Sequence, residues 1–222
     1  DNIDVKYAEE NGIAVRNTPG ASSQSVAELA MGHMFACTRY ISIAGHTMRE
    51  GKWEKKAYGK GIELQGKTLG IIGFGRIGQH LGVMAKAIGM NVVAYSTTRR
   101  PEVEAKFGIP YVTLEELLAQ SDFISLHAPA APGAPLINAD TIAKMKDGVI
   151  LINNARGQLI HEQDVADALN SGKMGAAGLD VVYTEPIRAD NPLLKAKNCI
   201  ITPHISWAPK ESRQRIMDLS LI

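Results

Sequence analysis

The fold is decided by Leu69-Gly70-Ile71-Ile72-Gly73-Phe74-Gly75-Arg76-Ile77-Gly78, where an apolar strand leads directly into the pattern G-x-G-x-x-G and a helix-forming stretch. Gly73 allows a tight turn, Gly75 removes a side chain that would block a pyrophosphate, and Gly78 lets the helix pack against the strand. The free N–H groups at the start of such a helix favour an anion. The stretch therefore predicts a dinucleotide site, with an ordinary glycine-rich turn as the alternative.

Apolar runs alternate with helical patterns through the middle of the chain. We expect an α/β fold, a doubly wound parallel sheet of the Rossmann type, because such runs are typical of strands covered by helices on both faces. Ligands of these sheets bind at the C-terminal ends of the strands. The predicted strands lie near residues 69–72, 91–95, 122–126, 149–153, 175–180 and 199–202, and the predicted helices near 76–88, 114–119, 139–145 and 161–170.

Composition narrows the class of protein. The chain has 222 residues, a net charge of +1 and 45% hydrophobic residues, which suits a large domain with a full core. We expect no nucleic-acid partner and no membrane partner, since long basic runs and apolar stretches of about 20 residues are both missing. We expect no metal site. Cys37 and Cys199 are predicted to be buried thiols in a reducing compartment, the cytoplasm.

The residues after the second strand bear on cofactor choice. Ser96 stands where an NAD-specific site usually has Asp or Glu, whose carboxylate repels the 2′-phosphate of NADP. Ser96, Thr97 and Thr98 can donate to phosphate oxygens, and Arg99 and Arg100 can pair with them. The sequence favours NADP over NAD, and a solvated basic turn on an NAD enzyme is the alternative.

A long helix is predicted before the sheet, from a capping-box spacing at Ser25 and Glu28 to about Arg49. Its apolar face could serve a core or a dimer contact, so a homodimer is plausible. His33 and His46 on this helix are interpreted as packing or surface residues rather than ligands. The apolar face consists of Leu29, Met31, Met34, Phe35, Cys37 and Ile41.

The two ends suggest a piece of a longer polypeptide. The first residues are predicted to form a short helix, a turn and a strand over 4–15 with no visible partner, and 212–222 resemble a helix without a C-cap. We expect remnants of a second, substrate-binding domain at 1–20 and, as the start of a returning helix, at 205–222. The dinucleotide-binding domain is expected at 21–204.

Polar residues follow several predicted strands. Arg156 suits a substrate carboxylate, which a guanidinium holds bidentately, and a structural ion pair is the alternative. His204 can move the proton that accompanies hydride transfer, and Glu185 can keep it charged and oriented. His127 competes for the acid role, but its position is better suited to backbone contacts with the ribose of the cofactor.

Short motifs occur in one order along essentially the whole chain, and together they resemble the D-isomer-specific 2-hydroxyacid dehydrogenases. They are Asn17-Thr18-Pro19, Ser25-Val26-Ala27-Glu28-Leu29, 66–78, 121–127, Met145-Lys146-Asp147-Gly148, Asn154-Ala155-Arg156-Gly157, Gly178-Leu179-Asp180-Val181 and Thr202-Pro203-His204.

The resemblance implies that hydride passes between a nicotinamide cofactor and a 2-oxo or 2-hydroxy acid. Arg156 would bind the substrate carboxylate, His204 would be the general acid or base, and Glu185 would hold His204. The expected cofactor-binding residues are Gly73, Gly75, Arg76, Ile77 and Gly78 near the pyrophosphate, Ser96, Thr97, Arg99 and His127 near the ribose, and Ala128, Asn154, Ala155, Asp180 and Ser206 toward the nicotinamide.

Within the family the signals are mixed. Residues 189–194 and Trp207 resemble glycerate dehydrogenases, also called hydroxypyruvate reductases, whereas the first third resembles phosphoglycerate dehydrogenases. Glu185 argues against formate dehydrogenase, which carries Gln there. We favour reduction of hydroxypyruvate or glyoxylate to D-glycerate or glycolate. The alternatives are a D-3-phosphoglycerate dehydrogenase, a catalytically inactive dinucleotide-binding fragment, and a co-repressor-like binding module.

Overall fold

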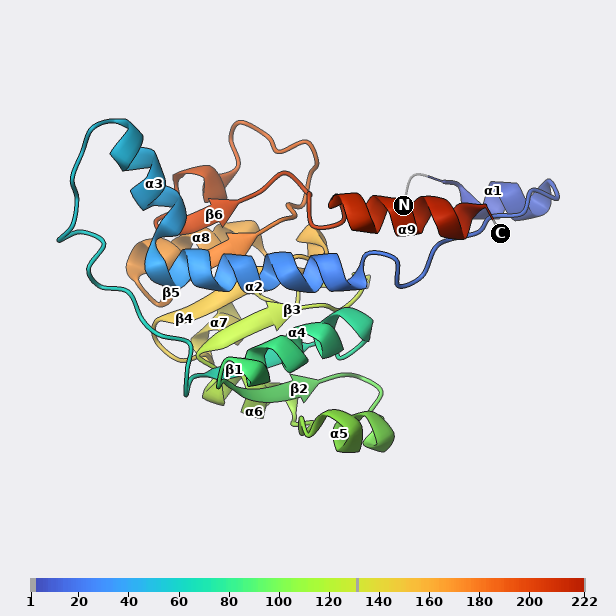
Figure 1. The fold of residues 1–222 in the computed structure, drawn as a ribbon, viewed down its shortest axis with the longest axis horizontal. Coiled ribbons are helices and arrows are strands. Elements are labelled where there is room, and N and C mark those ends of the chain that lie inside the picture. The colour runs from blue at the N-terminus through green and yellow to red at the C-terminus, as the bar shows by residue number, and fades with distance from the viewer. Residues whose placement is uncertain (1–2, 131, 222) are drawn as a thin grey trace.

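Six parallel strands form one sheet in the order β2-β1-β3-β4-β5-β6 (Figure 1). A computed structural model describes residues 3–130 and 132–221, so positions 1, 2 and 222 of the predicted terminal remnants lie outside the described residues. The predicted doubly wound parallel sheet is confirmed. The strands are β1 (Thr68–Ile72), β2 (Asn91–Tyr95), β3 (Phe123–Leu126), β4 (Val149–Asn153), β5 (Met174–Leu179) and β6 (Cys199–Ile201).

Helices connect the strands and cover both faces of the sheet. On one face, α2 and α4 enclose a core with Leu69, Ile71 and Phe123; on the other, α6, α7 and α8 pack over Ile124, Leu126 and their neighbours. The helices are α1 (Val5–Glu10), α2 (Ser23–Arg39), α3 (Ile41–Arg49), α4 (Arg76–Ala87), α5 (Pro101–Phe107), α6 (Leu114–Gln120), α7 (Ala139–Ala143), α8 (Glu162–Ser171) and α9 (Lys210–Ser220), with 3-10 turns at Gly157–Leu159 and Pro192–Lys195.

The C-terminal ends of the strands meet at one edge of the sheet. Backbone hydrogen bonds tie the segments beyond them: Gly73 N donates to Tyr95 O at 2.8 Å, His127 N to Ile72 O at 2.7 Å, and Asp180 N to Asn153 O at 2.9 Å. Helices α1 and α9 lie beyond this edge (Figure 1). The edge is therefore continuous, and the residues after the strands can serve one extended ligand.

The predicted single helix over 25–49 is wrong, because Tyr40 adopts a left-handed conformation (φ 55°) that separates α2 from α3. Two contacts explain the break. The Thr38 carbonyl accepts from Ile62 N at 3.2 Å, and the Tyr40 ring packs on Tyr58 at 5.9 Å between centroids. The predicted capping box is also absent, since α2 begins at Ser23 and Glu28 accepts from Gln24 instead.

The apolar face of that helix is divided between core and surface. Met31, Met34 and Cys37 are buried against the sheet, whereas Phe35 and Ile41 are exposed. Burial raises the pKa of the Cys37 thiol to about 12, and that of Cys199 also to about 12, although Cys199 is only partly buried rather than fully as predicted.

Two further expectations need correction. Residues 13–15 form no strand, because no neighbouring strand offers them hydrogen bonds within the described part of the chain. Helix α5 was not predicted, although Pro101 at its first position and Gly108 in a left-handed conformation after its end are typical helix signals. The predicted terminal helix at 212–222 begins slightly earlier, at Lys210.

Candidate active site

The glycine turn after β1 has the shape that a pyrophosphate requires. Gly73 has φ of 94°, and a Cβ on it would lie 2.5 Å from Ala128 N. A Cβ on Gly78 would lie 2.5 Å from Gly73 O, so this glycine lets α4 start close to the turn. A Cβ on Gly75 would meet nothing within 4 Å, and Gly75 caps α4 without a side-chain hydrogen bond. The first N–H groups of α4, beginning at Arg76 and Ile77, have no acceptor within the helix, and the space beside Gly75 is open to a ligand.

The turn after β2 lies beside the glycine turn, because Tyr95 O accepts from Gly73 N. Ser96 is half-buried, whereas Thr97, Arg99 and Arg100 are exposed. Hydroxyl and guanidinium groups therefore lie in the turn that an adenosine ribose would reach from the glycine turn.

The loop after β4 carries Arg156 and is fixed from both sides. Asn153 donates from Nδ2 to Arg156 O at 2.9 Å and accepts at Oδ1 from Ala155 N at 3.1 Å. A Cβ on Gly157 would overlap the backbone of Val182. The Arg156 loop is consequently pressed against the segment that leads to Glu185, and the exposed Arg156 side chain also donates to Ala155 O at 2.7 Å.

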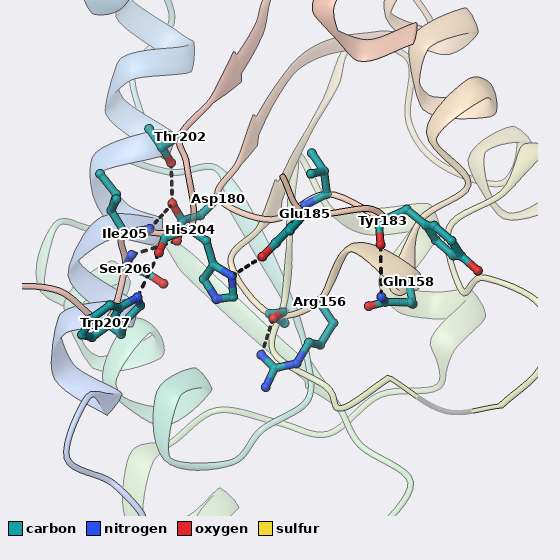
Figure 2. Close-up of polar contacts among 12 residues, drawn as sticks. Arg156, Gln158, Asp180, Tyr183, Glu185, Thr202, His204, Ile205, Ser206 and Trp207 are labelled. Carbon is teal, nitrogen blue, oxygen red and sulfur yellow. Dashed lines mark hydrogen bonds and ion pairs between the residues drawn. The ribbon is translucent and has the colours of Figure 1, made fainter. Parts of the chain in front are cut away.

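His204 and Glu185 form an ion pair beyond β6 and β5 (Figure 2). The His204 Nδ1 atom lies 2.7 Å from Glu185 Oε2, which leaves Nε2 directed away from the carboxylate. His204 has φ of 52°, an uncommon conformation for a residue with a side chain. Its backbone is held by hydrogen bonds from its own N–H to Asp180 O at 2.9 Å and from Trp207 Nε1 to its carbonyl at 3.0 Å.

Asp180 is fully buried and accepts three hydrogen bonds from the chain around it. Its Oδ1 accepts from Thr202 Oγ1 at 2.6 Å and from Ile205 N at 2.9 Å, and its Oδ2 accepts from Ser206 N at 2.8 Å (Figure 2). A carboxylate oxygen can accept two hydrogen bonds. Asp180 Oδ2 therefore has room for one more donor.

The His127 ring is turned into the protein. Its Nε2 atom lies 2.8 Å from Ser125 Oγ, and its Nδ1 atom is buried without a hydrogen-bond partner among the described residues, even though the residue as a whole is only half-buried. Burial lowers the pKa of His127 to about 4. The His127 ring is therefore a poor proton donor near neutral pH. Its backbone, in contrast, borders the glycine turn.

Asn154 is 4% exposed and contacts His33 of α2, which is itself buried. Its Nδ2 atom is buried without a partner in the part of the chain that the structure describes. A buried polar group without a partner is costly, so this end of the amide suits a polar ligand group. Together with the open space at Gly75, this observation fits a dinucleotide bound along the edge.

The structure brings the predicted catalytic residues to the loops after β4, β5 and β6 and leaves the predicted ribose residues after β2 at least three strands away, as a long ligand requires. His127, which follows β3, lies between the two groups. Sequence reasoning assigned no supporting role to the residues that hold them in place: Asn153, Gly157, Thr202, Trp207 and His33. Asn153 and Gly157 carried a signal, since both are typical of constrained loops. His46 is exposed and pairs with Glu50 at 3.1 Å, as expected of a surface histidine.

Across residues 3–130 and 132–221, no cluster of three or more His, Cys, Asp or Glu residues has the arrangement to hold a metal ion. Over the same ranges, none of the helices combines the length and apolar character needed to cross a bilayer.

Comparison with known proteins gives a consistent result. The family described as "D-isomer specific 2-hydroxyacid dehydrogenase, NAD binding domain" matches residues 31–206. A hydroxypyruvate reductase of Blautia hydrogenotrophica is 53% identical over 99% of this chain and 70% of its own length. A D-3-phosphoglycerate dehydrogenase of Methanocaldococcus jannaschii is 47% identical over 96% of this chain but only 41% of its own length.

Solved structures agree with the sequence matches. The crystal structure of a glyoxylate reductase from Paecilomyes thermophila superposes with a TM-score of 0.90 at 38% identity, covering 100% of this chain and 67% of that one. The sequence and structure comparisons both cover nearly the whole chain.

Proposed function

This chain belongs to the D-isomer specific 2-hydroxyacid dehydrogenase family, and from that premise we propose that it reduces hydroxypyruvate or glyoxylate to D-glycerate or glycolate with NADPH. The observation that carries the proposal is the His204–Glu185 pair at 2.7 Å beside the fixed Arg156 loop. The identity to a protein named hydroxypyruvate reductase supports the choice of acid.

The cofactor would lie along the strand ends. Gly73, Gly75 and Gly78 with the first N–H groups of α4 would hold the pyrophosphate, and Ser96 would face the adenosine ribose. When bound, the reduced nicotinamide supplies a hydride for C2 of the acid. Thr97 and Arg99 would hold the 2′-phosphate of NADP, while His127, Ala128, Asn154, Ala155, Asp180 and Ser206 would complete the remaining contacts.

His204 would donate the proton that the substrate oxygen requires. Because Nδ1 bonds to Glu185, Nε2–H is the available donor of the imidazolium. The Glu185 carboxylate accepts the hydrogen bond from Nδ1–H and fixes the orientation of the ring. Each turnover consumes one proton from solvent, which restores the imidazolium after the hydroxy acid leaves.

Arg156 would bind the substrate carboxylate and draw charge from the adjacent carbonyl. The Asn153 bonds and the contact between Gly157 and Val182 fix the backbone from which its side chain extends. Two sheet-end loops would therefore act together, one holding the acid and the other delivering the proton.

A kinetic comparison tests the proposal. The chain is assayed with hydroxypyruvate, glyoxylate and 3-phosphohydroxypyruvate, each with NADPH and with NADH. We expect the largest kcat/KM for hydroxypyruvate with NADPH. Preference for the phosphorylated acid would support the D-3-phosphoglycerate dehydrogenase alternative, and cofactor binding without turnover would support an inactive fragment or binding module.

A homodimer is the proposed assembly, with the face built from exposed apolar residues of α3 and the loop after it. Ile41, Met48 and Trp53 are exposed by 57%, 50% and 79%. Sedimentation equilibrium of the chain and of a Trp53→Glu variant tests this: we expect a dimer for the first and a monomer for the second.

The location in the cytoplasm and the domain limits at 1–20, 21–204 and 205–222 stay predictions from the sequence.

A further inference from the structure

His33 sits in a space made for its ring. It is 3% exposed on α2, and the helix packs directly over β5. A Cβ on Gly178 would lie 2.7 Å from His33 Cβ and 3.0 Å from its Cγ. The absence of a side chain at Gly178 therefore allows the imidazole to reach the loops beyond β4 and β6.

One ring nitrogen is a hydrogen-bond donor. His33 Nε2 lies 3.2 Å from Thr202 Oγ1, and Thr202 Oγ1 donates to Asp180 Oδ1 at 2.6 Å. A hydroxyl has one proton, and a carboxylate can only accept. Thr202 gives its proton to Asp180 and consequently accepts from His33 Nε2–H.

The other ring nitrogen sets the orientation of Asn154. Burial lowers the pKa of His33, so the ring is neutral near pH 7 and Nδ1 is an acceptor. Nδ1 lies 3.2 Å from the Asn154 amide oxygen, a second acceptor. A half-turn of the amide, whose two ends have the same shape, lets the otherwise unpartnered Nδ2 donate to Nδ1 and turns the oxygen to the opposite side.

We infer that His33 is a positioning residue that makes Asn154 and Asp180 two acceptors for an NH2 group, the carboxamide of the nicotinamide. Through Thr202 it fixes Asp180, whose Oδ2 can accept one more bond, and through its Nδ1 it fixes the Asn154 oxygen. The inference rests on the proposed function, and it adds a role for His33 in the recognition of the carboxamide on the nicotinamide ring.

Binding measurements test the inference without turnover. Three probes are titrated into the chain: NADP⁺, its nicotinic acid analogue with a carboxylate in place of the carboxamide, and 2′-phospho-ADP-ribose, which lacks the ring. We expect the parent chain to bind NADP⁺ at least about tenfold more tightly than the carboxylate analogue, because two acceptors repel a carboxylate. The same titrations with NAD⁺ and its counterparts apply if the chain prefers NAD.

Three variants separate positioning from packing. His33→Leu should lower the ratio of the two Kd values at least about threefold while the Kd of 2′-phospho-ADP-ribose stays within about twofold. His33→Asn places an amide at the distance of Nδ1 and His33→Gln at that of Nε2, so each should restore part of the ratio. Met34→Leu, a volume-conserving change on the same buried face, should leave the ratio unchanged.

The outcomes distinguish the possible failures. An unchanged ratio in all three His33 variants would overturn the inference, as would an equal loss of affinity for all three probes. A parent chain that binds none of the probes would instead contradict the proposed function.

Discussion

The two halves of the sheet edge are organised by different interactions. Beyond β4, β5 and β6, side chains fix the loops through hydrogen bonds to other side chains and to backbone groups: Glu185 holds His204, Asn153 holds the Arg156 loop, and Asp180 accepts three hydrogen bonds. Beyond β1 and β2, the shape is set by backbone, with Gly73 hydrogen-bonded to Tyr95. We call the part beyond β4, β5 and β6 the reacting half and the part beyond β1 and β2 the adenosine half. We infer that the reacting half determines the reaction, whereas the adenosine half accepts changes of cofactor with little effect on the fold.

The largest expected effect lies in the reacting half, at His204. His204→Asn removes the proton donor, so kcat should fall about a thousandfold, within the range for general acid catalysis, while the Kd of NADPH changes less than about twofold. Stopped-flow kinetics and fluorescence titration measure the two quantities. The matched control is His161→Asn, which removes an exposed histidine paired with Asp164 at 2.9 Å and should leave kcat within about twofold. A similar loss in both variants would contradict the assignment.

The next effect concerns the contact that joins two loops of the same half. Gly157→Ala places a methyl group in the backbone of Val182, so the loops must separate. We expect the free energy of unfolding to fall by about 3 kcal/mol and kcat/KM to fall at least tenfold. Urea unfolding and steady-state kinetics test this.

Gly32→Ala is the control for that measurement, because a Cβ there meets nothing and the position lies inside α2. It should raise the free energy of unfolding by about 0.5–1 kcal/mol through helix propensity. If both substitutions had the same effect, the packing of the Arg156 loop against Val182 would not matter.

The free energy of unfolding should depend on pH through His127, which lies where the two halves meet. Its folded-state pKa of about 4 lies below the 6.5 of an unfolded histidine, so the unfolded chain binds the proton first as the pH falls. The stability that comes from the neutral ring is complete above pH 6.5 and is lost between pH 6.5 and about 4, by up to about 3 kcal/mol. His127→Gln, which keeps a polar atom near Ser125, should lose correspondingly less stability over that interval. Urea unfolding at several pH values compares the two chains, and identical pH dependence would contradict the burial of the ring.

The comparison of the halves also accounts for what the sequence could predict. The strands were predictable because runs such as Val149–Asn153 are apolar throughout, and the glycine turn because its residues are adjacent in sequence. The order of the strands placed Arg156 and His204 at one edge. The left-handed conformation of Tyr40 was not predictable from the helix alone. It depends on contacts with Tyr58 and Ile62, which lie outside that helix in the loop that follows α3.

The residues that support the reacting half could not be predicted from the sequence for the same reason. The contact between His33 and Thr202 joins positions 169 residues apart, and no local pattern encodes it. A buried histidine on an apolar helix face is more often a packing residue, so only the hydrogen bonds of Asp180 give His33 a polar role. Gly178 permits the contact, but a glycine within a strand is equally typical of a bulge or a tight bend.

The smallest effect is expected in the adenosine half, at Ser96. Ser96→Asp introduces a carboxylate that accepts the ribose hydroxyls of NAD and repels the 2′-phosphate of NADP, so the ratio of kcat/KM for NADPH to that for NADH should fall about tenfold. The free energy of unfolding should change by less than about 0.5 kcal/mol, because the turn is half-buried at most. Ala105→Asp, on the exposed surface of α5 after the same turn, adds the same charge and should leave the ratio unchanged. A ratio that moves equally in both variants would mean that the general charge of this surface, rather than a contact at Ser96, selects the cofactor. A ratio that moves only in Ser96→Asp, without loss of stability, would sharpen the contrast with Gly157→Ala, where activity and folding should fall together.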